Sequence, residues 1–248
     1  SVRLTESGEH LLPNARRTLQ DAESCFTQIS DLKQMLSGTL NIGITHTFAP
    51  ILNEAVRTFI KHYPGVSINV MVSNMEDVLS ALKRGNLDFV LCFKPASLDD
   101  EIEAHILFDS QLSIIVGQDH PLAQKKSVTF EDIRLYRFAM PQRVTQARLL
   151  FNYCFPAAKD VLDVRAEIGD IAVLLDIVRS SQLVTVLSES TLYNRTGLKA
   201  IPIDANIPQM EGCVHTLKRS YRKRAAEEFI RILSQTNAVM ERAHKWIR

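Results

Sequence analysis

The sequence predicts an α/β fold in which two Rossmann-like lobes are joined by two extended crossover connections and preceded by a long linker helix. Two observations lead to this prediction. Short, mostly apolar strands alternate with amphipathic helices over residues 39–93, and the alternation returns over residues 137–187. Such alternation is typical of parallel sheets with helices on both faces. The segments at 102–117 and 198–218 are strand-like without helices between them, which suits connections between lobes.

The composition is that of an ordinary globular protein. The chain has 248 residues, of which 46% are hydrophobic and 23% charged, so one large domain or two small ones can bury a core. Its 29 basic and 28 acidic residues leave a net charge of +1, which does not favour nucleic-acid binding by this segment alone. The four cysteines show no C-x-x-C spacing, and no apolar run is long enough to span a membrane. These observations predict a cytoplasmic protein with buried free thiols and no contact with a membrane.

Residues 5–36 are predicted to form the long linker helix. Thr5 is a suitable N-cap, and Glu6 and Glu9 place negative charge in the first turn. Pro13 is expected to kink the helix, because it removes one backbone hydrogen bond. Apolar residues recur at steps of three and four, as in a coiled coil: Leu12, Ala15, Leu19, Ala22, Phe26, Ile29 and Leu36. This narrow seam favours pairing with another chain, as a dimerisation helix, over packing on the helix's own domain.

The linker helix is predicted to be separate from the domain that follows. Residues 1–37 form one unit and residues 38–248 the other, with Ser37 and Gly38 between them. Residues 2–4 have strand-like side chains but no strand to pair with, and the chain does not begin with Met. We therefore expect that further sequence precedes Ser1 in the intact protein.

The domain of residues 38–248 is expected to contain two lobes. The first comprises about residues 38–115 and 216–248, and the second about residues 116–215. In the first lobe the expected elements alternate between strand and helix: residues 39–44, 48–63, 66–72, 74–84 and 88–93. The second lobe again begins with a strand: residues 137–140, 144–155, 164–168, 170–180 and 183–187. A helix over residues 222–245 is predicted to end the chain.

No catalytic or metal-binding motif is present in the sequence. The chain lacks H-E-x-x-H, G-x-S-x-G, a P-loop and a G-x-G-x-x-G after a strand, and its seven histidines show no metal-ligand spacing. We therefore expect a protein that is not an enzyme and holds no cofactor or metal. Cys92 with a distant histidine would make a nucleophilic pair, but a buried structural thiol is the favoured interpretation. The basic run at residues 218–224 is followed by Glu227 and Glu228, which favours a solvated corner over a phosphate site.

Polar residues follow several strands at the points where helices begin. Thr45, His46 and Thr47 follow the first strand, and residues 141–145 follow the first strand of the second lobe. Lys94 follows the strand at the end of the first series. In open α/β sheets ligands bind at the carboxyl ends of strands, where the N–H groups of helix N-termini favour anions. We therefore predict a cleft between the lobes that binds a small anionic molecule.

Several stretches resemble LysR-type transcriptional regulators. "VRLTESGEHLLPNARRTL" is similar to the end of their winged helix-turn-helix domain and the start of their linker helix. "GTLNIGITHTFAPILNEAVRTFIKHYPGVSINV" resembles the first strand, helix and second strand of their effector-binding domain. "GNLDFVLCF", "SIIVGQDHPLA", "LYRFAMP" and "LVTVLSES" match later landmarks in order and spacing. The resemblance covers essentially the whole chain, and the succession of motifs is more specific than any one of them.

The resemblance implies a periplasmic-binding-protein-like effector domain in a bacterial cytoplasmic regulator. It implies that promoter DNA is bound by an N-terminal winged helix-turn-helix domain missing from this chain, and that the protein is a homodimer or homotetramer. A small-molecule effector, anionic in character, is implied in the cleft. Carried over by position, its contacts fall on Thr45, His46, Thr47, Phe93, Lys94, Gln142, Arg143, Thr145, Ile168 and Gly169. Many members have Ser where this chain has His46, which adds a group that can titrate.

Two other functions stay open at this point. A periplasmic-type solute-binding protein for a small anionic solute shares the two-lobe fold, but the seam of the linker helix and the four cysteines argue against it. A two-lobe enzyme with a histidine or cysteine in the cleft is opposed only by the absence of motifs.

Overall fold

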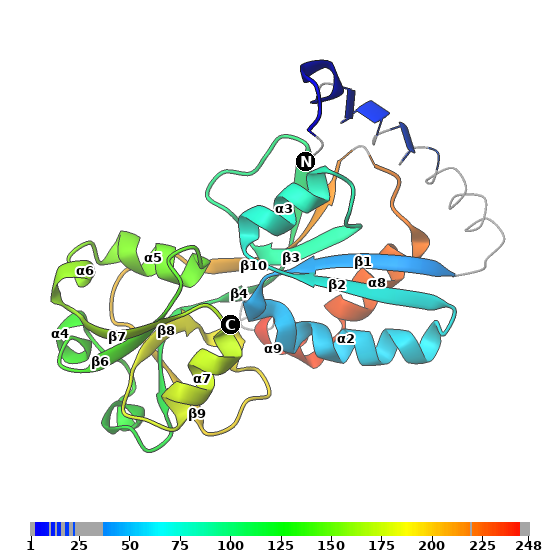
Figure 1. The fold of residues 1–248 in the computed structure, drawn as a ribbon. Coiled ribbons are helices and arrows are strands. Elements are labelled where there is room, and N and C mark those ends of the chain that lie inside the picture. The colour runs from blue at the N-terminus through cyan, green and yellow to red at the C-terminus, as the bar shows by residue number, and fades with distance from the viewer. Residues whose placement is uncertain are drawn as a thin grey trace.

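The computed structural model of the protein describes residues 3–9, 11–12, 14–15, 18–19, 22, 37–218 and 220–243. Beyond residue 37 the chain forms two α/β lobes joined by extended strands (Figure 1), which is the fold class predicted from the sequence. In the predicted linker helix, the described residues from 6 to 22 are helical. Phe26, Ile29 and Leu36 of its seam lie outside the described residues.

The first lobe is built on a five-stranded sheet. Its strand order is β2 (Val66–Val72), β1 (Gly38–Ile44), β3 (Phe89–Phe93), β10 (Met210–Leu217) and β4 (Ile102–Ser110). β1 pairs in parallel with β2 and β3, whereas β10 runs antiparallel to β3 and β4. β3 lies in the middle of the sheet and is buried along its whole length, which explains its continuous apolar sequence.

Helices cover both faces of this sheet (Figure 1). α2 (Ala49–His62), α8 (Arg224–Ser234) and α9 (Asn237–Ala243) lie on one face, and α3 (Met75–Lys83) lies on the other. α2 ends ahead of Pro64, which cannot continue a helix. α3 begins after Asn74, whose side chain accepts the N–H of Asp77 at 3.0 Å. It ends before Gly85, whose φ of +70° is a left-handed conformation that favours glycine.

The second lobe repeats the strand arrangement of the first. β6 (Arg137–Pro141) pairs in parallel with β7 (Asp163–Ile168), and β5 (Leu112–Gly117) lies between β8 (Thr185–Ser188) and β9 (Leu198–Pro202), antiparallel to both. A parallel bridge between Phe138 and Val184 joins the two groups, so the row reads β7, β6, β8, β5, β9. Each lobe thus has three neighbouring parallel strands, a fourth strand antiparallel to them, and a fifth antiparallel to the fourth. No corresponding repeat is visible in the sequence.

The chain crosses between the lobes twice, and its crossing points differ slightly from the predicted ones. β5 pairs with strands of the second lobe, so residues 112–115, expected in the first lobe, lie in the second. β10 pairs with strands of the first lobe, so residues 210–215, expected in the second lobe, lie in the first. At each crossing the predicted boundary falls within one strand, β5 or β10. The strands that pair with β5 and β10 are remote from them in the sequence.

One further prediction is wrong in part. The helix predicted over residues 222–245 is divided into α8 and α9 around Thr236, whose hydroxyl donates to the carbonyl oxygen of Leu233 at 2.7 Å. β2 is an edge strand of the first sheet. The side chains of its last residues, Val70, Met71 and Val72, are 36%, 36% and 46% exposed.

The remaining helices among the described residues are short. They are α4 (Phe130–Ile133), α5 (Gln146–Cys154), α6 (Ala158–Val161), α7 (Ile171–Arg179), η1 (His46–Phe48), η2 (Pro121–Gln124) and η3 (Glu189–Leu192), of which the last three are 3-10 helices. No helix in the described part of the chain is long and apolar enough to cross a membrane.

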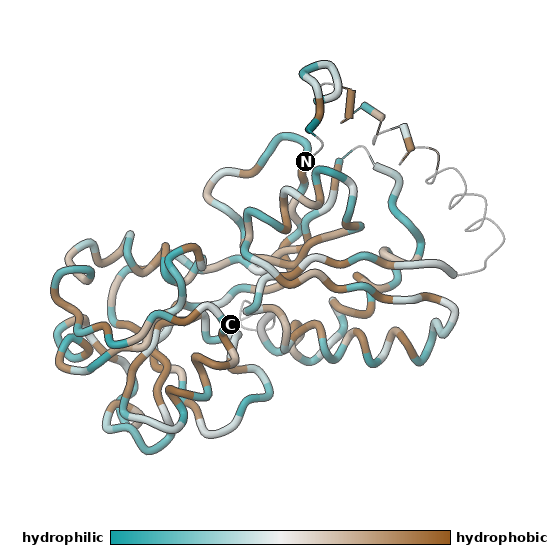
Figure 2. The backbone as a smooth tube through the Cα atoms, in the orientation of Figure 1, coloured by the Kyte–Doolittle hydropathy of each residue, from teal (hydrophilic) through white to brown (hydrophobic). Residues whose placement is uncertain are grey.

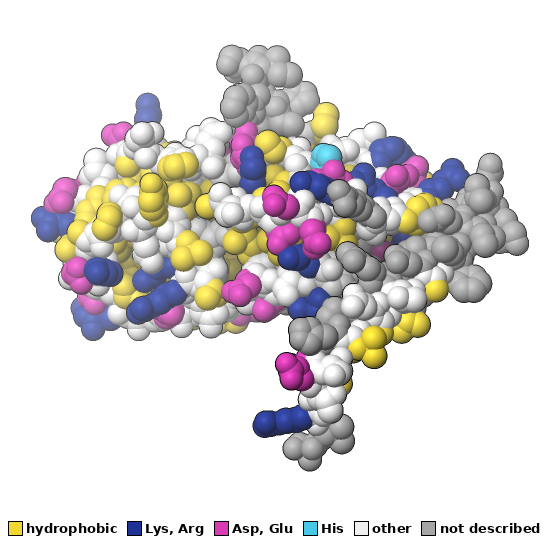
Figure 3. Space-filling model, turned by 90° about the horizontal axis from the view of Figure 1, so that it is seen from above, with side chains coloured by type: hydrophobic (Ala, Val, Ile, Leu, Met, Phe, Trp, Pro, Cys, Tyr) yellow, Lys and Arg dark blue, Asp and Glu magenta, His cyan; other side chains and the backbone are white. Residues whose placement is uncertain are grey.

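Hydrophobic residues gather along the strands of both lobes (Figure 2). At the cleft end of the first lobe three phenylalanines pack together: the ring centroid of Phe48 lies 5.0 Å from that of Phe93 and 5.7 Å from that of Phe108. Apolar side chains are also exposed on the second lobe over α5 and α6 (Figure 3), among them Val144, Leu149 and Tyr153.

Candidate functional site

A cavity of about 210 Å³ lies between the two lobes, where the sequence predicted a cleft. Its walls come from the carboxyl ends of strands in both sheets, since parallel strands of each lobe end at this edge. Of the predicted contact residues, the cavity is lined by Thr45, His46, Thr47, Phe93, Gln142, Thr145 and Gly169. The structure therefore brings together residues that are up to 124 positions apart in this sequence.

The first-lobe wall is built by the turn from β1 into η1. Thr45 is extended, with φ of −84° and ψ of 154°, and its N–H donates to the carbonyl oxygen of Leu91 at 3.1 Å. The hydroxyl oxygens of Thr45 and Thr47 lie 3.3 Å apart, so they share one hydrogen bond. Neither hydroxyl caps η1 or α2. The first N–H groups of this turn therefore have no side-chain cap among the described residues.

The second-lobe wall is built by the turn from β6 into α5. The hydroxyl of Thr145 donates to the carbonyl oxygen of Gln142 at 2.8 Å and does not cap α5. Gln146 reaches across the cavity edge, and its Nε2 donates to the carbonyl oxygen of Phe93 in the first lobe at 2.9 Å. The side chain of Gln142 lies over Gly169, where an added Cβ would be 2.8 Å from Nε2. Glycine at this position leaves room for the Gln142 amide in the cavity wall.

Three of the predicted contact residues do not line the cavity. The Nζ of Lys94 pairs with Oε2 of Glu211 at 2.8 Å, and this hydrogen bond raises the pKa of Lys94. The side chain of Arg143 is 81% exposed and lies 3.6 Å from a carboxylate oxygen of Glu167. Ile168 packs against the core of the lobe. The expected convergence of Lys94 and Arg143 on the cleft is therefore wrong in this structure.

Sequence reasoning missed other lining residues: Val72, Ser73, Asn74, Met75, Val144, Gln146, Ala147 and Ile171. Val72 ends β2 and the next three residues follow it, and β2 lies beside β1 in the parallel sheet and ends at the same edge. The end of this neighbouring strand was the sequence signal that could have predicted these lining residues. Ser73 and Asn74 also hold α3 in place, because their side chains donate to Oδ2 of Asp77 at 2.6 and 2.7 Å.

His46 is the only ionisable side chain among the described residues that line the cavity. Asp170 lies just outside the cavity and caps α7, with Oδ1 accepting the N–H groups of Ala172 and Val173 at 2.8 and 3.0 Å. The hydrogen bond from the N–H of Val173 is the main cause that lowers the pKa of Asp170, and electrostatic interactions with His46 and Arg195 act in the same direction. The cavity thus offers hydroxyls, amides and N–H groups, without an arginine or lysine in its described wall.

Cys92 has a histidine neighbour, but the pair does not lie at the cavity. Its Sγ is 3.5 Å from Nδ1 of His215, and both side chains are 0% exposed. Burial raises the pKa of the Cys92 thiol and lowers the pKa of His215 to about 4. A protonated, buried thiol is a poor nucleophile, so this pair is structural. Among the described residues, no group of three His, Cys, Asp or Glu side chains is placed to hold a metal ion.

Residues 33–238 match the LysR substrate binding domain family. The chain belongs to this family. Among LysR-type relatives, it is 32% identical over 139 residues to the HTH-type transcriptional regulator YtlI of Bacillus subtilis, a match that covers 56% of this chain and 45% of YtlI. The chain thus spans about half the length of that relative.

Solved structures of LysR-type domains share the fold. The regulatory domain of CcmR from Synechocystis PCC6803, in complex with 2-PG, matches with a TM-score of 0.69 at 22% identity, over 80% of this chain and 96% of that one. The effector binding domain of QuiR, in complex with shikimate, matches with a TM-score of 0.65 at 17% identity, over 84% of this chain and 98% of that one. The resemblance to a LysR effector-binding domain is therefore confirmed, and it is favoured over the solute-binding alternative.

Proposed function

We propose that this chain senses a small molecule in the inter-lobe cavity, as the regulatory part of a LysR-type transcription regulator. The observation that carries the proposal is the construction of the cavity: both lobes supply polar groups to it, and the hydrogen bond from Gln146 to Phe93 spans them. A molecule bound there touches both lobes at once. Its binding therefore favours the lobe arrangement in which both walls fit it, which is how a ligand shifts a conformational population.

The lining indicates the chemistry of the effector. Hydroxyls come from Thr45, Thr47, Ser73 and Thr145, and amides from Asn74, Gln142 and Gln146. These groups suit a ligand rich in oxygen atoms. Helix-start N–H groups without side-chain caps favour one anionic group on it, with His46 nearby. A cavity of about 210 Å³ is below the usual range for drug-sized ligands, so the effector is a small metabolite.

The ligands of the related structures agree with this chemistry. QuiR was solved with shikimate and CcmR with 2-phosphoglycolate, both small oxygen-rich carboxylates. We infer a small hydroxylated carboxylate, closer to shikimate than to 2-phosphoglycolate, as the effector of this chain. With no lysine or arginine in the described wall, a single negative charge fits better than several.

A thermal-shift screen of small hydroxylated carboxylates, including shikimate and 2-phosphoglycolate, tests this proposal. A compound at 100 times its Kd stabilises the folded protein by about 2.7 kcal/mol. Thr47→Val and Gln142→Ala should weaken binding roughly tenfold or less, because each removes one hydrogen bond. Lys94→Met is the matched control outside the cavity and should leave binding unchanged. A cationic ligand, or one that binds both cavity variants as tightly as the wild type, would show that the site or its charge is placed wrongly.

For the intact protein we propose a cytoplasmic homodimer or homotetramer that binds promoter DNA through an N-terminal winged helix-turn-helix domain outside this chain. Leu19 supports pairing of the linker helices, since its side chain is 67% exposed in the single chain. Leu19→Asp together with Phe26→Asp should reduce the molar mass measured by light scattering. Residues 1–248 alone should bind duplex DNA weakly. Tight, selective binding in a gel shift would contradict the proposal that a separate N-terminal domain binds the promoter.

A further inference from the structure

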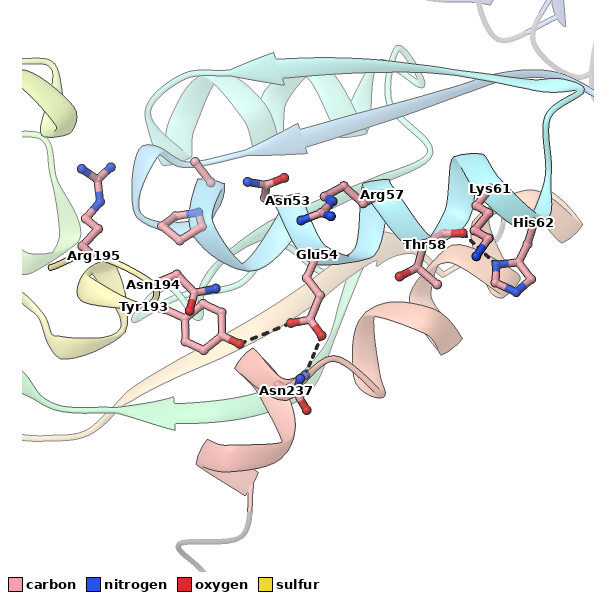
Figure 4. Close-up of a pocket in the computed structure, with 12 residues that line it drawn as sticks. Asn53, Glu54, Arg57, Thr58, Lys61, His62, Tyr193, Asn194, Arg195 and Asn237 are labelled. Carbon is pink, nitrogen blue, oxygen red and sulfur yellow. Dashed lines mark hydrogen bonds between the residues drawn. The ribbon is translucent and has the colours of Figure 1, made fainter.

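A second, larger hollow lies along α2, away from the effector cavity (Figure 4). Its volume is about 910 Å³. One wall is the polar side of α2, from Pro50 to His62, and the other is formed by the segment after η3 and by the start of α9. We call this hollow the α2 groove. α2 and α9 belong to the first lobe, whereas the segment after η3 belongs to the second, so both lobes build the groove.

The α2 groove contains cations that no carboxylate of the described chain neutralises by direct contact. Arg57, Lys61 and Arg195 line it, and none of them takes part in an ion pair among the described residues. Several lysines elsewhere on the described surface are paired. Lys83 lies 2.6 Å from Asp99, and Lys125 lies 2.6 Å from Asp132. The groove thus gathers three cations that have no direct carboxylate partner among the described residues.

Among the described residues that line the groove, Glu54 is the one carboxylate, and it is already hydrogen-bonded by other groove residues. Oε2 of Glu54 accepts the hydroxyl of Tyr193 at 3.3 Å, and Oε1 accepts the backbone N–H of Asn237 at 3.1 Å (Figure 4). Glu54 therefore connects α2 to both parts of the opposite wall, the segment after η3 and the start of α9. Both carboxylate oxygens of Glu54 thus accept hydrogen bonds from the groove itself. The cations of the groove remain available to an external partner.

Asparagine side chains add a second kind of recognition. Asn53, Asn194 and Asn237 line the groove, and each amide offers both a donor and an acceptor. That combination matches the alternating N–H and C=O groups of an extended peptide backbone. Asn194 is in the left-handed conformation, with φ of 56°, which is uncommon for a residue other than glycine and is often found at functional positions.

The shape of the α2 groove decides between a peptide and a small molecule. Pro50 to His62 span about 18 Å at 1.5 Å per residue, and Arg195 lies beyond one end of this stretch (Figure 4). An extended peptide of about six residues covers that length at roughly 3.3 Å per residue. Small ligands instead occupy concave sites that bury most of their surface. A long, open, polar groove favours a chain segment.

We propose that the α2 groove binds an extended acidic peptide segment of a partner protein. Carboxylates of the segment pair with Arg57 and Lys61 at one end and with Arg195 at the other, and the asparagines bind its backbone. This site is separate from the effector cavity, so the proposal does not depend on the identity of the effector.

Fluorescence polarisation with a labelled ten-residue peptide of alternating Glu and Ser tests the proposal on residues 1–248. The Glu peptide should bind at low salt and more weakly at high salt, and the matching Gln–Ser peptide should not bind. Arg57→Gln and Lys61→Gln should each weaken binding roughly two- to fivefold, as expected for exposed charge pairs. Lys126→Gln and Lys159→Gln are matched controls on exposed lysines outside the groove and should change nothing.

Three results would overturn the proposal. Equal binding of the Glu peptide to the groove variants and the wild type would place its site elsewhere. Displacement of the peptide by inorganic triphosphate at a far lower concentration than by unlabelled peptide would show a phosphate site. A change of molar mass by light scattering in the groove variants, without a change in peptide binding, would show that a second copy of this chain covers the groove.

Discussion

Gln146 Nε2 donates a hydrogen bond of 2.9 Å to the carbonyl oxygen of Phe93. Gln146 is the first residue of α5 in the second lobe, and Phe93 is the last residue of β3 in the first. Both residues also line the inter-lobe cavity, the proposed effector site. The bond therefore connects the two lobes at the place where a ligand would contact both, and a ligand that competes for either group would alter that connection.

Gln146→Leu is expected to loosen the contact between the lobes. The substitution removes the donor while keeping a similar side-chain volume. One hydrogen bond contributes about 1 kcal/mol net, so the free energy of unfolding in urea should fall by about that amount. The radius of gyration measured by small-angle X-ray scattering should rise. Gln124→Leu at the exposed end of η2 is the matched control. Scattering curves that coincide for all three proteins would contradict a role of Gln146 in holding the lobes.

The buried His215 predicts a loss of stability in mild acid. Burial lowers its pKa from 6.5 to about 4 in the folded protein. The unfolded chain, with the ordinary pKa, binds a proton more readily as the pH falls. The stabilisation from the neutral form is therefore complete above about pH 6.5 and is lost as the pH falls toward 4. His120, whose pKa burial also lowers, acts in the same direction.

Urea unfolding at two pH values measures this effect. From His215 we expect a free energy of unfolding roughly 2 kcal/mol lower at pH 5 than at pH 7. His215→Gln should remove most of this difference, because glutamine does not titrate. His105→Gln, at a side chain that is 59% exposed, is the control and should retain it. An unchanged pH dependence in His215→Gln would mean that other groups cause it.

Two glycines should respond differently to the same substitution. A Cβ on Gly43 would lie 2.6 Å from Cδ1 of Leu87 and 2.9 Å from Cγ2 of Val90, in the packed core beneath α3. Gly43→Ala should therefore cost about 1–3 kcal/mol of unfolding free energy. A Cβ on Gly169 would meet the flexible end of Gln142, so Gly169→Ala should cost less than about 1 kcal/mol. Chemical denaturation of both variants tests this order, and equal losses would contradict it.

The contact between Lys223 and Asp88 should stabilise the start of α8 against β1. Lys223 Nζ lies 2.9 Å from Oδ1 of Asp88 and donates to the carbonyl oxygen of Thr39 at 3.0 Å. Asp88 Oδ2 also accepts the N–H of Asn41 at 2.7 Å.

Lys223→Met should therefore lower the free energy of unfolding by about 1 kcal/mol, and Asp88→Ala by about 1–3 kcal/mol, since the second change removes an acceptor from both Lys223 and the N–H of Asn41. Lys126→Met on an exposed loop is the matched control. A melting temperature as high for Asp88→Ala as for this control would mean that the contact contributes nothing.

Local patterns were sufficient for the order and type of most elements. The strand predicted at residues 66–72 has the bounds of β2, because its apolar run ends at turn residues on both sides. The predicted final helix was wrong where tertiary contacts intervene. The N–H of Asn237, which begins α9, donates to Glu54 of α2, 183 residues away. The hydrophobic periodicity of residues 222–245 gives no information about a partner in α2.

By itself the sequence determined the fold class and the position of the cavity, because the ends of parallel strands meet at one edge whatever the details of packing. Only the tertiary structure decided which charges reach that edge. Lys94 follows Phe93 directly, yet its Nζ pairs with Glu211 on β10, 117 residues away. Arg143 follows Gln142, yet it lies beside Glu167 on β7. A long cationic side chain takes the carboxylate that strand pairing brings within its reach, and strand pairing between remote segments leaves no local pattern in the sequence.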